Sequence, residues 1–189
     1  SRFVNGVLGA VYIELGEPGK NEGGERKKDA SKTGKMPVEE LVGAVVYARD
    51  LPAPGAARQA GGGEIYLALV HDIFGHWTLS KGKLKENESH EDGVKRKVME
   101  EVGLDVSVDE KLGENEYIAN DSDKGGKKRR HATYFLARAD FQDLSLKKAG
   151  GLDDAQWFPL ASVGDLNFYD DILPVVTRSI NLLAQKSKK

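Results

Sequence analysis

The chain contains no cysteine among its 189 residues. This absence excludes disulfide bonds and thiolate metal sites, so any metal ion must be held by oxygen or imidazole ligands. Oxygen ligands favour a hard cation, and we therefore expect Mg²⁺, or Mn²⁺ in its place, if the protein uses a metal.

Long hydrophobic runs and a large excess of charge of one sign are also missing. The longest apolar stretch near the N-terminus, residues 7–15, contains Glu14, is too short to span a bilayer and lacks the basic flank of a signal peptide. We therefore expect a cytoplasmic protein without a membrane partner. Because the formal net charge is −2, an anion-binding role would require a local basic cluster.

The length fits one well-packed domain. Residues 16–38 are rich in Gly, Lys and Glu and have almost no large apolar side chains, so we predict a long mobile loop there. Residues 4–15 have the composition of a strand. We therefore divide the chain into an N-terminal strand with a mobile charged loop, residues 1–39, and a folded domain, residues 40–189.

Within the folded domain, short apolar and β-branched runs predict strands, and one longer periodic segment predicts a final helix. The expected strands are 41–47, 65–70, 105–108, 116–119, 131–138 and the surroundings of 156–158. A connection rich in Pro, Ala and Gly, residues 52–63, suits a flexible hairpin, and the final helix is expected over 170–184. Mixed strands with two main helices indicate an α/β or α+β fold with a mostly buried sheet.

The clearest helix is predicted over residues 90–102. Ser89 can cap its free amides, Asp92 can complete a capping box, and Gly103 can end it. Three valines recur at four-residue spacing and predict an apolar stripe that packs on a sheet. Lys97, Glu100 and Glu101 fall on another side of the helix, which is free for chemistry.

The segment 82–104, GKLKENESHEDGVKRKVMEEVGL, leads from a glycine loop into this helix. It resembles the signature of the Nudix family: Gly, five residues, Glu, seven residues, Arg-Glu, an aliphatic residue, any residue, Glu-Glu, any residue, Gly and an aliphatic residue. The matching residues are Gly82, Glu88, Arg96, Val98, Glu100, Glu101, Gly103 and Leu104. The single departure is Lys97, which stands where the family has glutamate.

The resemblance covers roughly residues 40–184 and implies a Nudix fold, a mixed β-sheet sandwiched between helices. It implies that Glu88 and Arg96 form a structural ion pair that fixes the loop on the helix. It also makes Glu100 and Glu101 the metal-binding and catalytic carboxylates. Gly82 would let the backbone approach the cation, with the carbonyl of Lys81 as a further ligand.

The activity implied by the resemblance is metal-assisted hydrolysis of a nucleoside diphosphate linked to another moiety. The segments WTLSKGKL, HATYFLA and LNFYDDILPVV are similar to those of dinucleoside polyphosphate hydrolases, so dinucleoside polyphosphates or nucleoside triphosphates are the expected small-molecule partners. Candidate substrate contacts lie beside the box and on the basic turn and strand near residues 124–137; they are Lys81, Lys83, Lys128, Arg130, His131 and Tyr134. A solvated hairpin tip is the alternative for the turn.

Lys97 occupies a substituted catalytic position, since the family has glutamate there. An ammonium can neither bind a cation nor activate water beside one. Three explanations remain open: slow turnover with a carboxylate from elsewhere, a domain that only binds its ligand, or a residue substituted to trap a complex. The candidate supplementary carboxylates are Glu114, Glu116, Asp121 and Asp123. A nucleotide-, RNA- or protein-binding module is thus the alternative to an enzyme. In either case we expect a monomer or a homodimer.

Overall fold

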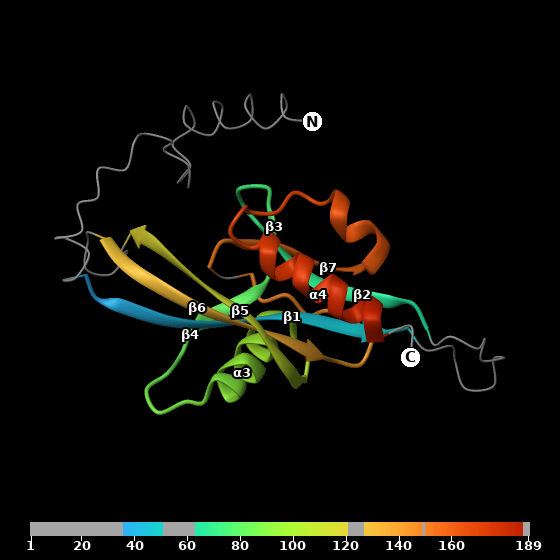
Figure 1. Cartoon of the computed structure of the whole chain (residues 1–189), viewed down its shortest axis with the longest axis horizontal. Helices are drawn as coiled ribbons and strands as arrows, with labels where there is room; N and C mark the ends of the chain where they lie inside the picture. Colours follow the sequence, from blue (N-terminus) through green and yellow to red (C-terminus); the bar gives the residue numbers. More distant parts are fainter. Residues whose placement is uncertain (1–35, 51–62, 121–126, 149, 187–189) are drawn as a thin grey trace, which may run out of the picture. The chain divides into compact units, whose positions relative to one another are not determined.

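The computed structural model describes residues 36–50, 63–120, 127–148 and 150–186 (Figure 1). Three predicted segments lie wholly or almost wholly outside the described residues. They are the strand at 4–15, the loop at 16–38 and the connection at 52–63. No helix in the described part is long and apolar enough to span a membrane.

The described strands form one mixed sheet in which β1 is central. The strands are β1 (Val38–Arg49), β2 (Ile65–Asp72), β3 (Trp77–Thr78), β4 (Ser80–Lys83), β5 (Ser107–Asn120), β6 (Lys127–Arg138) and β7 (Leu152–Pro159). β1 pairs in parallel with β6 and antiparallel with both β2 and β4. β5 continues the sheet beyond β6, while β3 and β7 both pair with β2.

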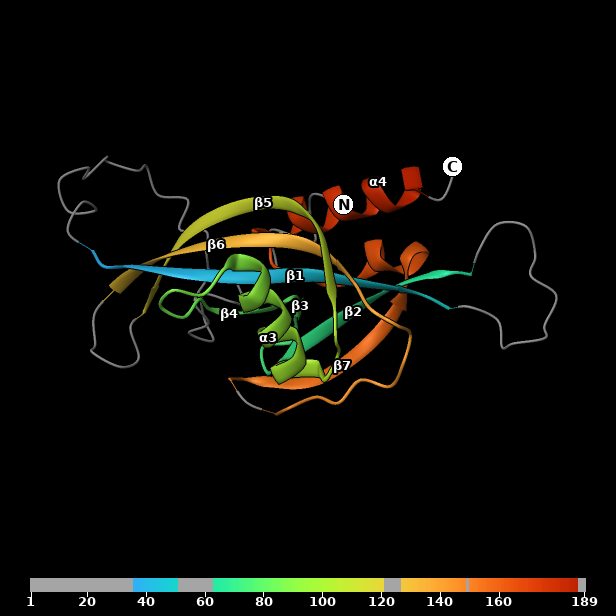
Figure 2. The same ribbon diagram turned by 90° about the horizontal axis from the view of Figure 1, so that it is seen from below.

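Both faces of the sheet are covered. Helix α3 (His90–Val102) lies on one face and helix α4 (Leu173–Lys186) on the other (Figure 1), and the view from below shows α3 in front of β1 (Figure 2). Residues 41–48 of β1 are therefore buried without interruption, as their apolar sequence predicts. Two apolar cores result: one contains Val175 and Leu183 of α4, and the other contains Val94 and Val98 of α3.

Most of the predicted elements are confirmed. The strands predicted at 41–47, 65–70, 131–138 and 156–158 lie within β1, β2, β6 and β7. Residues 116–119 lie in a strand as predicted, but they and residues 107–108 belong to one long strand, β5, which spans residues 107–120, so the division into two strands is wrong. Register shifts between Val108 and Glu110 and between Lys111 and Gly113 let this irregular sequence stay paired with β6.

Helix α3 has the predicted bounds. The Ser89 hydroxyl accepts a hydrogen bond from the Asp92 backbone N–H at 3.1 Å, and Gly103 ends the helix with a φ of 72°. A Cβ atom at Gly93 would lie 2.7 Å from the side chain of Leu84, so glycine permits a close approach of the helix to the segment directly after β4. Helix α4 starts three residues later than predicted, after a turn in which the Ile172 N–H donates to Tyr169.

Candidate functional site

The loop before α3 is fixed on the helix by Arg96. Its Nε donates to Glu88 Oε1 at 2.6 Å and its guanidinium also donates to Glu88 Oε2 at 2.7 Å and to the Lys83 carbonyl at 2.9 Å. Hydrogen bonds from Arg96 and from the Lys85 backbone lower the pKa of Glu88 to about 2. The structure thus places these residues as expected of an ion pair that joins loop and helix.

Lys97 lies between the two adjacent carboxylates of the box, Glu100 and Glu101. Its Nζ is 3.2 Å from Glu100 Oε2 and 3.4 Å from Glu101 Oε1. The side chain of Lys97 is only 18% exposed and that of Glu101 only 17%, whereas Glu100 is 42% exposed. The three side chains therefore form one compact ionic group on α3.

The glycine of β4 makes room for this lysine. A Cβ atom at Gly82 would lie 2.2 Å from Lys97 Cε and 2.6 Å from its Cδ, so the lysine chain runs directly over the glycine backbone. A hydrogen bond from Lys97 lowers the pKa of Glu100. Burial raises the pKa of Glu101, and the positive charge of Lys97 opposes that rise.

A small pocket opens beside this ionic group. It has a volume of about 160 Å³ and is lined by Lys97, Glu100, Glu101, Lys147 and Gly150. The segment after β6 forms its other wall, because the Lys147 N–H donates to the Glu101 carbonyl at 2.9 Å and anchors that segment to the end of α3. The box carboxylates thus face a pocket that also receives a second, exposed lysine.

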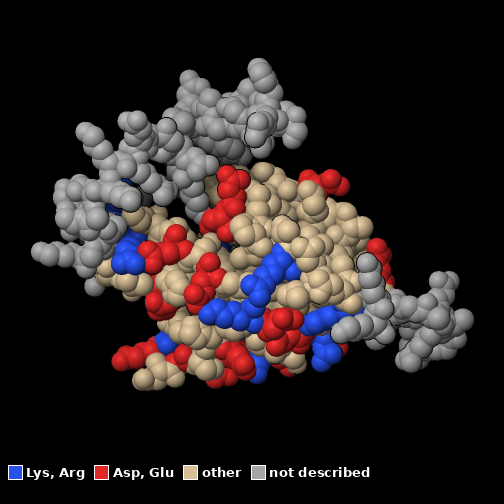
Figure 3. Space-filling view, viewed as in Figure 1, with Lys and Arg blue, Asp and Glu red and all other residues tan. Residues whose placement is uncertain are grey.

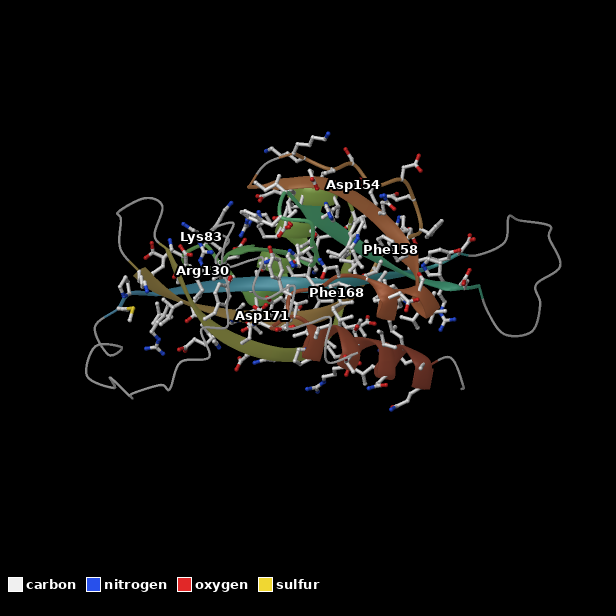
Figure 4. The ribbon with its side chains drawn as sticks, turned by 90° about the horizontal axis from the view of Figure 1, so that it is seen from above. Lys83, Arg130, Asp154, Phe158, Phe168 and Asp171 are labelled. Carbon is white, nitrogen blue, oxygen red and sulfur yellow. The ribbon has the colours of Figure 1, made fainter. Side chains whose placement is uncertain are left out.

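Three of the predicted substrate contacts gather elsewhere, on the α4 face of the sheet, around Glu39. Lys83 and Lys128 contact Glu39 Oε1 at 2.9 and 3.0 Å, and the Arg130 Nε donates to Oε2 at 2.8 Å. Lys83 and Arg130 lie beside one another in the view of Figure 4. Burial would raise the pKa of Glu39, but hydrogen bonds from Lys83, Lys128 and Arg130 outweigh it and lower the pKa to about 2.

For the remaining predicted contacts the structure gives other surroundings. Lys81 donates to the Thr78 hydroxyl at 3.1 Å. His131 belongs to the opposite face, where its Nδ1 lies 2.7 Å from Glu40 Oε2, and this hydrogen bond raises the pKa of the imidazole. Tyr134 is 0% exposed and its ring fills the space above Gly43, so in this conformation it cannot stack on a base as predicted.

Lys128 was predicted to contact substrate, with a solvated hairpin tip as the alternative, and the structure buries it instead. It is 5% exposed, and its ammonium donates to Glu39. Glu39, Glu40 and Lys147 were not foreseen as site residues. No local pattern marks them, because each becomes relevant only through contacts with a segment about 50 to 90 residues away, and those contacts arise from strand pairing and loop packing.

Comparison with known proteins connects this geometry with a family. The NUDIX domain family matches residues 51–178, which is more than half of the chain. The chain belongs to the Nudix family. A search among curated proteins found no significant relative of this sequence.

Several solved Nudix structures share the fold. The NUDIX domain of Shewanella oneidensis NrtR, complexed with ADP ribose, is similar with a TM-score of 0.57 at 20% identity, covering 92% of this chain and 97% of that one. A C. elegans Ap4A hydrolase in a binary complex has a TM-score of 0.55 at 18% identity, covering 78% of this chain and 98% of that one. The MutT protein from Methanosarcina mazei has a TM-score of 0.53 at 20% identity, covering 82% of this chain and 99% of that one. At these identities the likeness establishes the Nudix fold.

Nudix proteins typically use a divalent metal ion, but the residues of this Nudix domain do not fit one in the usual place. A cation, the Lys97 ammonium, already lies within 3.4 Å of both Glu100 and Glu101. Among the described residues, no group of three or more His, Asp or Glu side chains is placed to hold a metal. Of the supplementary candidates, Glu114 binds Lys111 and Glu116 binds Arg129, while Asp121 and Asp123 lie outside the described residues.

Proposed function

We propose that this Nudix domain binds a nucleoside diphosphate linked to another moiety and that Lys97 disables the hydrolytic step. The observation that carries the proposal is the position of the Lys97 ammonium, 3.2 Å from Glu100 and 3.4 Å from Glu101. A protonated lysine has three hydrogen-bond donors and no acceptor, so it cannot take a proton from an attacking water. Its charge also repels a metal ion that approaches the same carboxylates.

The ligand class is inferred from the family and from the chemistry of the site. Lys97 and Lys147 line the pocket at the box, and both can pair with phosphate. Dinucleoside polyphosphates and nucleoside triphosphates remain the ligands that the sequence favours. ADP-ribose joins them because it was found in the similar NrtR domain, and Ap4A because it is the substrate named for a similar hydrolase.

Hydrolysis in the chain as it stands is the second candidate, and one observation favours it. Glu100 and Glu101 still face a common pocket on a helix that the Arg96 ion pair fixes in place. If Lys97 swings away, these two carboxylates are available. Such an enzyme would be slow, because the third carboxylate of the family's signature is missing.

RNA remains a less favoured partner. The face shown in Figure 3 mixes acidic and basic side chains over the described surface, and the net charge is −2. Three basic side chains of β6 form ion pairs with carboxylates. Lys128 and Arg130 pair with Glu39, and Arg129 pairs with Glu116. RNA binding would therefore have to compete with these pairs.

The test compares the chain with its Lys97→Glu variant in Mg²⁺-containing buffer. Binding and product release are measured with Ap4A, ADP-ribose, a nucleoside triphosphate and capped RNA. Lys95→Glu is the matched control, because Lys95 is exposed on the same helix and undergoes the same change of charge. We expect binding without product in the unmodified chain and product only with Lys97→Glu. Rapid product release by the unmodified chain, or no binding of any ligand, would overturn the proposal.

A further inference from the structure

The box of this domain contains a cation of its own. The Lys97 ammonium contacts both Glu100 and Glu101, and its aliphatic chain is held against the Gly82 backbone. Contacts from three directions fix the position of the charge. The side chain is 18% exposed, so it loses much of its conformational entropy when the protein folds. Less of that entropy is then lost when a ligand binds.

The change of charge at this position matches that of a divalent ion. The family's glutamate contributes −1 and Lys97 contributes +1, a difference of two positive charges. One Mg²⁺ ion bound to the glutamate-containing site would add the same two charges. Bound cations are often the largest charges in a phosphate-binding site. Replacing the family's glutamate with Lys97 therefore changes the electrostatic field at the site about as much as binding one Mg²⁺ ion would.

The pocket beside Lys97 can receive an anion. Its volume of about 160 Å³ is many times the ~10–15 Å³ that a single water needs by the same measure, so a phosphate group can enter. Lys147 lines the same pocket as Lys97, and its exposed side chain is free of the packing that holds Lys97. Two ammonium groups can therefore approach one phosphate, in the way that lysines bind phosphates elsewhere.

From these observations we infer that Lys97 is a tethered replacement for the divalent ion, so that this domain binds the phosphates of its ligand without metal. The inference rests on the proposed function, since it concerns how the same ligand is held. It assigns Lys97 as a direct phosphate contact, with Lys147 as the second contact across the pocket. The competing explanation is that Lys97 only neutralises Glu100 and Glu101 and never touches the ligand.

The experiment measures the affinity for two probes, ADP-ribose and Ap4A, by calorimetry in EDTA and again in excess Mg²⁺. We expect the unmodified chain to bind with the same Kd, within about twofold, in both buffers. In EDTA, Lys97→Met should weaken binding by roughly ten- to a hundredfold, the loss that a hydrogen bond to a charged group carries. Mg²⁺ should restore part of that loss, because the variant leaves the two carboxylates free for the metal.

Lys95→Met is the control, since it removes an exposed charge from the same helix and should leave the affinity unchanged. The metal dependence of the unmodified chain needs no variant and tests metal-free binding even if Lys97→Met folds poorly. Binding that requires Mg²⁺ would overturn the inference and leave the proposed function intact. Metal-free binding that Lys97→Met does not weaken would show a neutralising role only, and no binding in either buffer would overturn both proposals.

Discussion

At position 97 one side chain determines which cation lies between Glu100 and Glu101. The sequence alone identified this position, because the other signature residues are at their expected spacing and only Lys97 departs. What the sequence could not give is where the ammonium goes. A flexible side chain can turn to solvent, and only its packing over Gly82 and its contacts with both carboxylates show that it stays in the site.

Glu39 is a residue whose role no sequence pattern predicts. It precedes the apolar part of β1, and its partners Lys83, Lys128 and Arg130 come from two other strands. Parallel pairing of β1 with β6 sets Glu39 opposite Arg130, and β4 adds Lys83. Such a cluster depends on the order and register of strands, which local sequence does not specify.

We predict that Glu39→Gln destabilises the fold in a pH-dependent manner. At neutral pH the free energy of unfolding of the variant should be lower by roughly 3 kcal/mol, the lower end of the range for breaking a buried ion pair, since Lys83, Lys128 and Arg130 lose the carboxylate that they share. The folded pKa of Glu39, about 2, lies below its ordinary value of 4.5. Its contribution is therefore complete above about pH 4.5 and is lost as the pH falls toward 2.

Urea denaturation of the unmodified chain and the variant between pH 3 and pH 7 measures this difference. Glu116→Gln is the comparison, because it breaks the exposed pair with Arg129 and should cost less than about 1 kcal/mol. A gap between Glu39→Gln and the unmodified chain that stays constant down to pH 3 would mean that Glu39 is not the stabilising group.

At the level of elements, helix α3 was fully predictable and strand β5 was not. The helix carries local signals at both ends, a serine cap and a terminating glycine, and an apolar stripe between them. β5 pairs along its whole length with β6 despite two register shifts. Its Gly, Asp and Glu residues interrupt any alternating pattern, so the strand exists because of its neighbour and not because of its own sequence.

The cap of α3 provides a test at this scale. Ser89→Ala removes the hydroxyl that accepts from the Asp92 N–H and should lower the free energy of unfolding by about 0.5–2 kcal/mol. The exposed Ser107, at the first position of β5, serves as the control, and Ser107→Ala should have little effect. Equal unfolding midpoints for the two variants in chemical denaturation would show that the cap contributes nothing.

At the scale of the whole domain, the order of strands was not predictable from the sequence alone, whereas the apolar runs that fill the two cores were. β1 and β6 are adjacent and parallel although about 80 residues separate them in the chain. Helices α3 and α4 pack on opposite faces of this sheet, and successive side chains of a strand point to opposite faces. The predicted substrate contacts were therefore divided between two faces.

The core on the α4 face is expected to carry a large part of the stability. Leu136 is 0% exposed within it, and Leu136→Ala should lower the free energy of unfolding by about 2–5 kcal/mol through lost burial and the cavity that remains. The control is Leu173→Ala, the same change at a leucine that is 42% exposed at the start of α4. Urea denaturation measures both, and a loss at Leu136 no larger than that at Leu173 would contradict the assigned packing.

The central claim is that Lys97 takes the place of the metal ion, and metal binding itself tests it most directly. Electron paramagnetic resonance can count Mn²⁺ ions bound to the unmodified chain and to Lys97→Glu in the absence of any nucleotide. The account predicts no Mn²⁺ bound at the box in the unmodified chain and at least one ion in the variant, which regains a third carboxylate beside Glu100 and Glu101. Mn²⁺ binding of equal affinity in both proteins would contradict it.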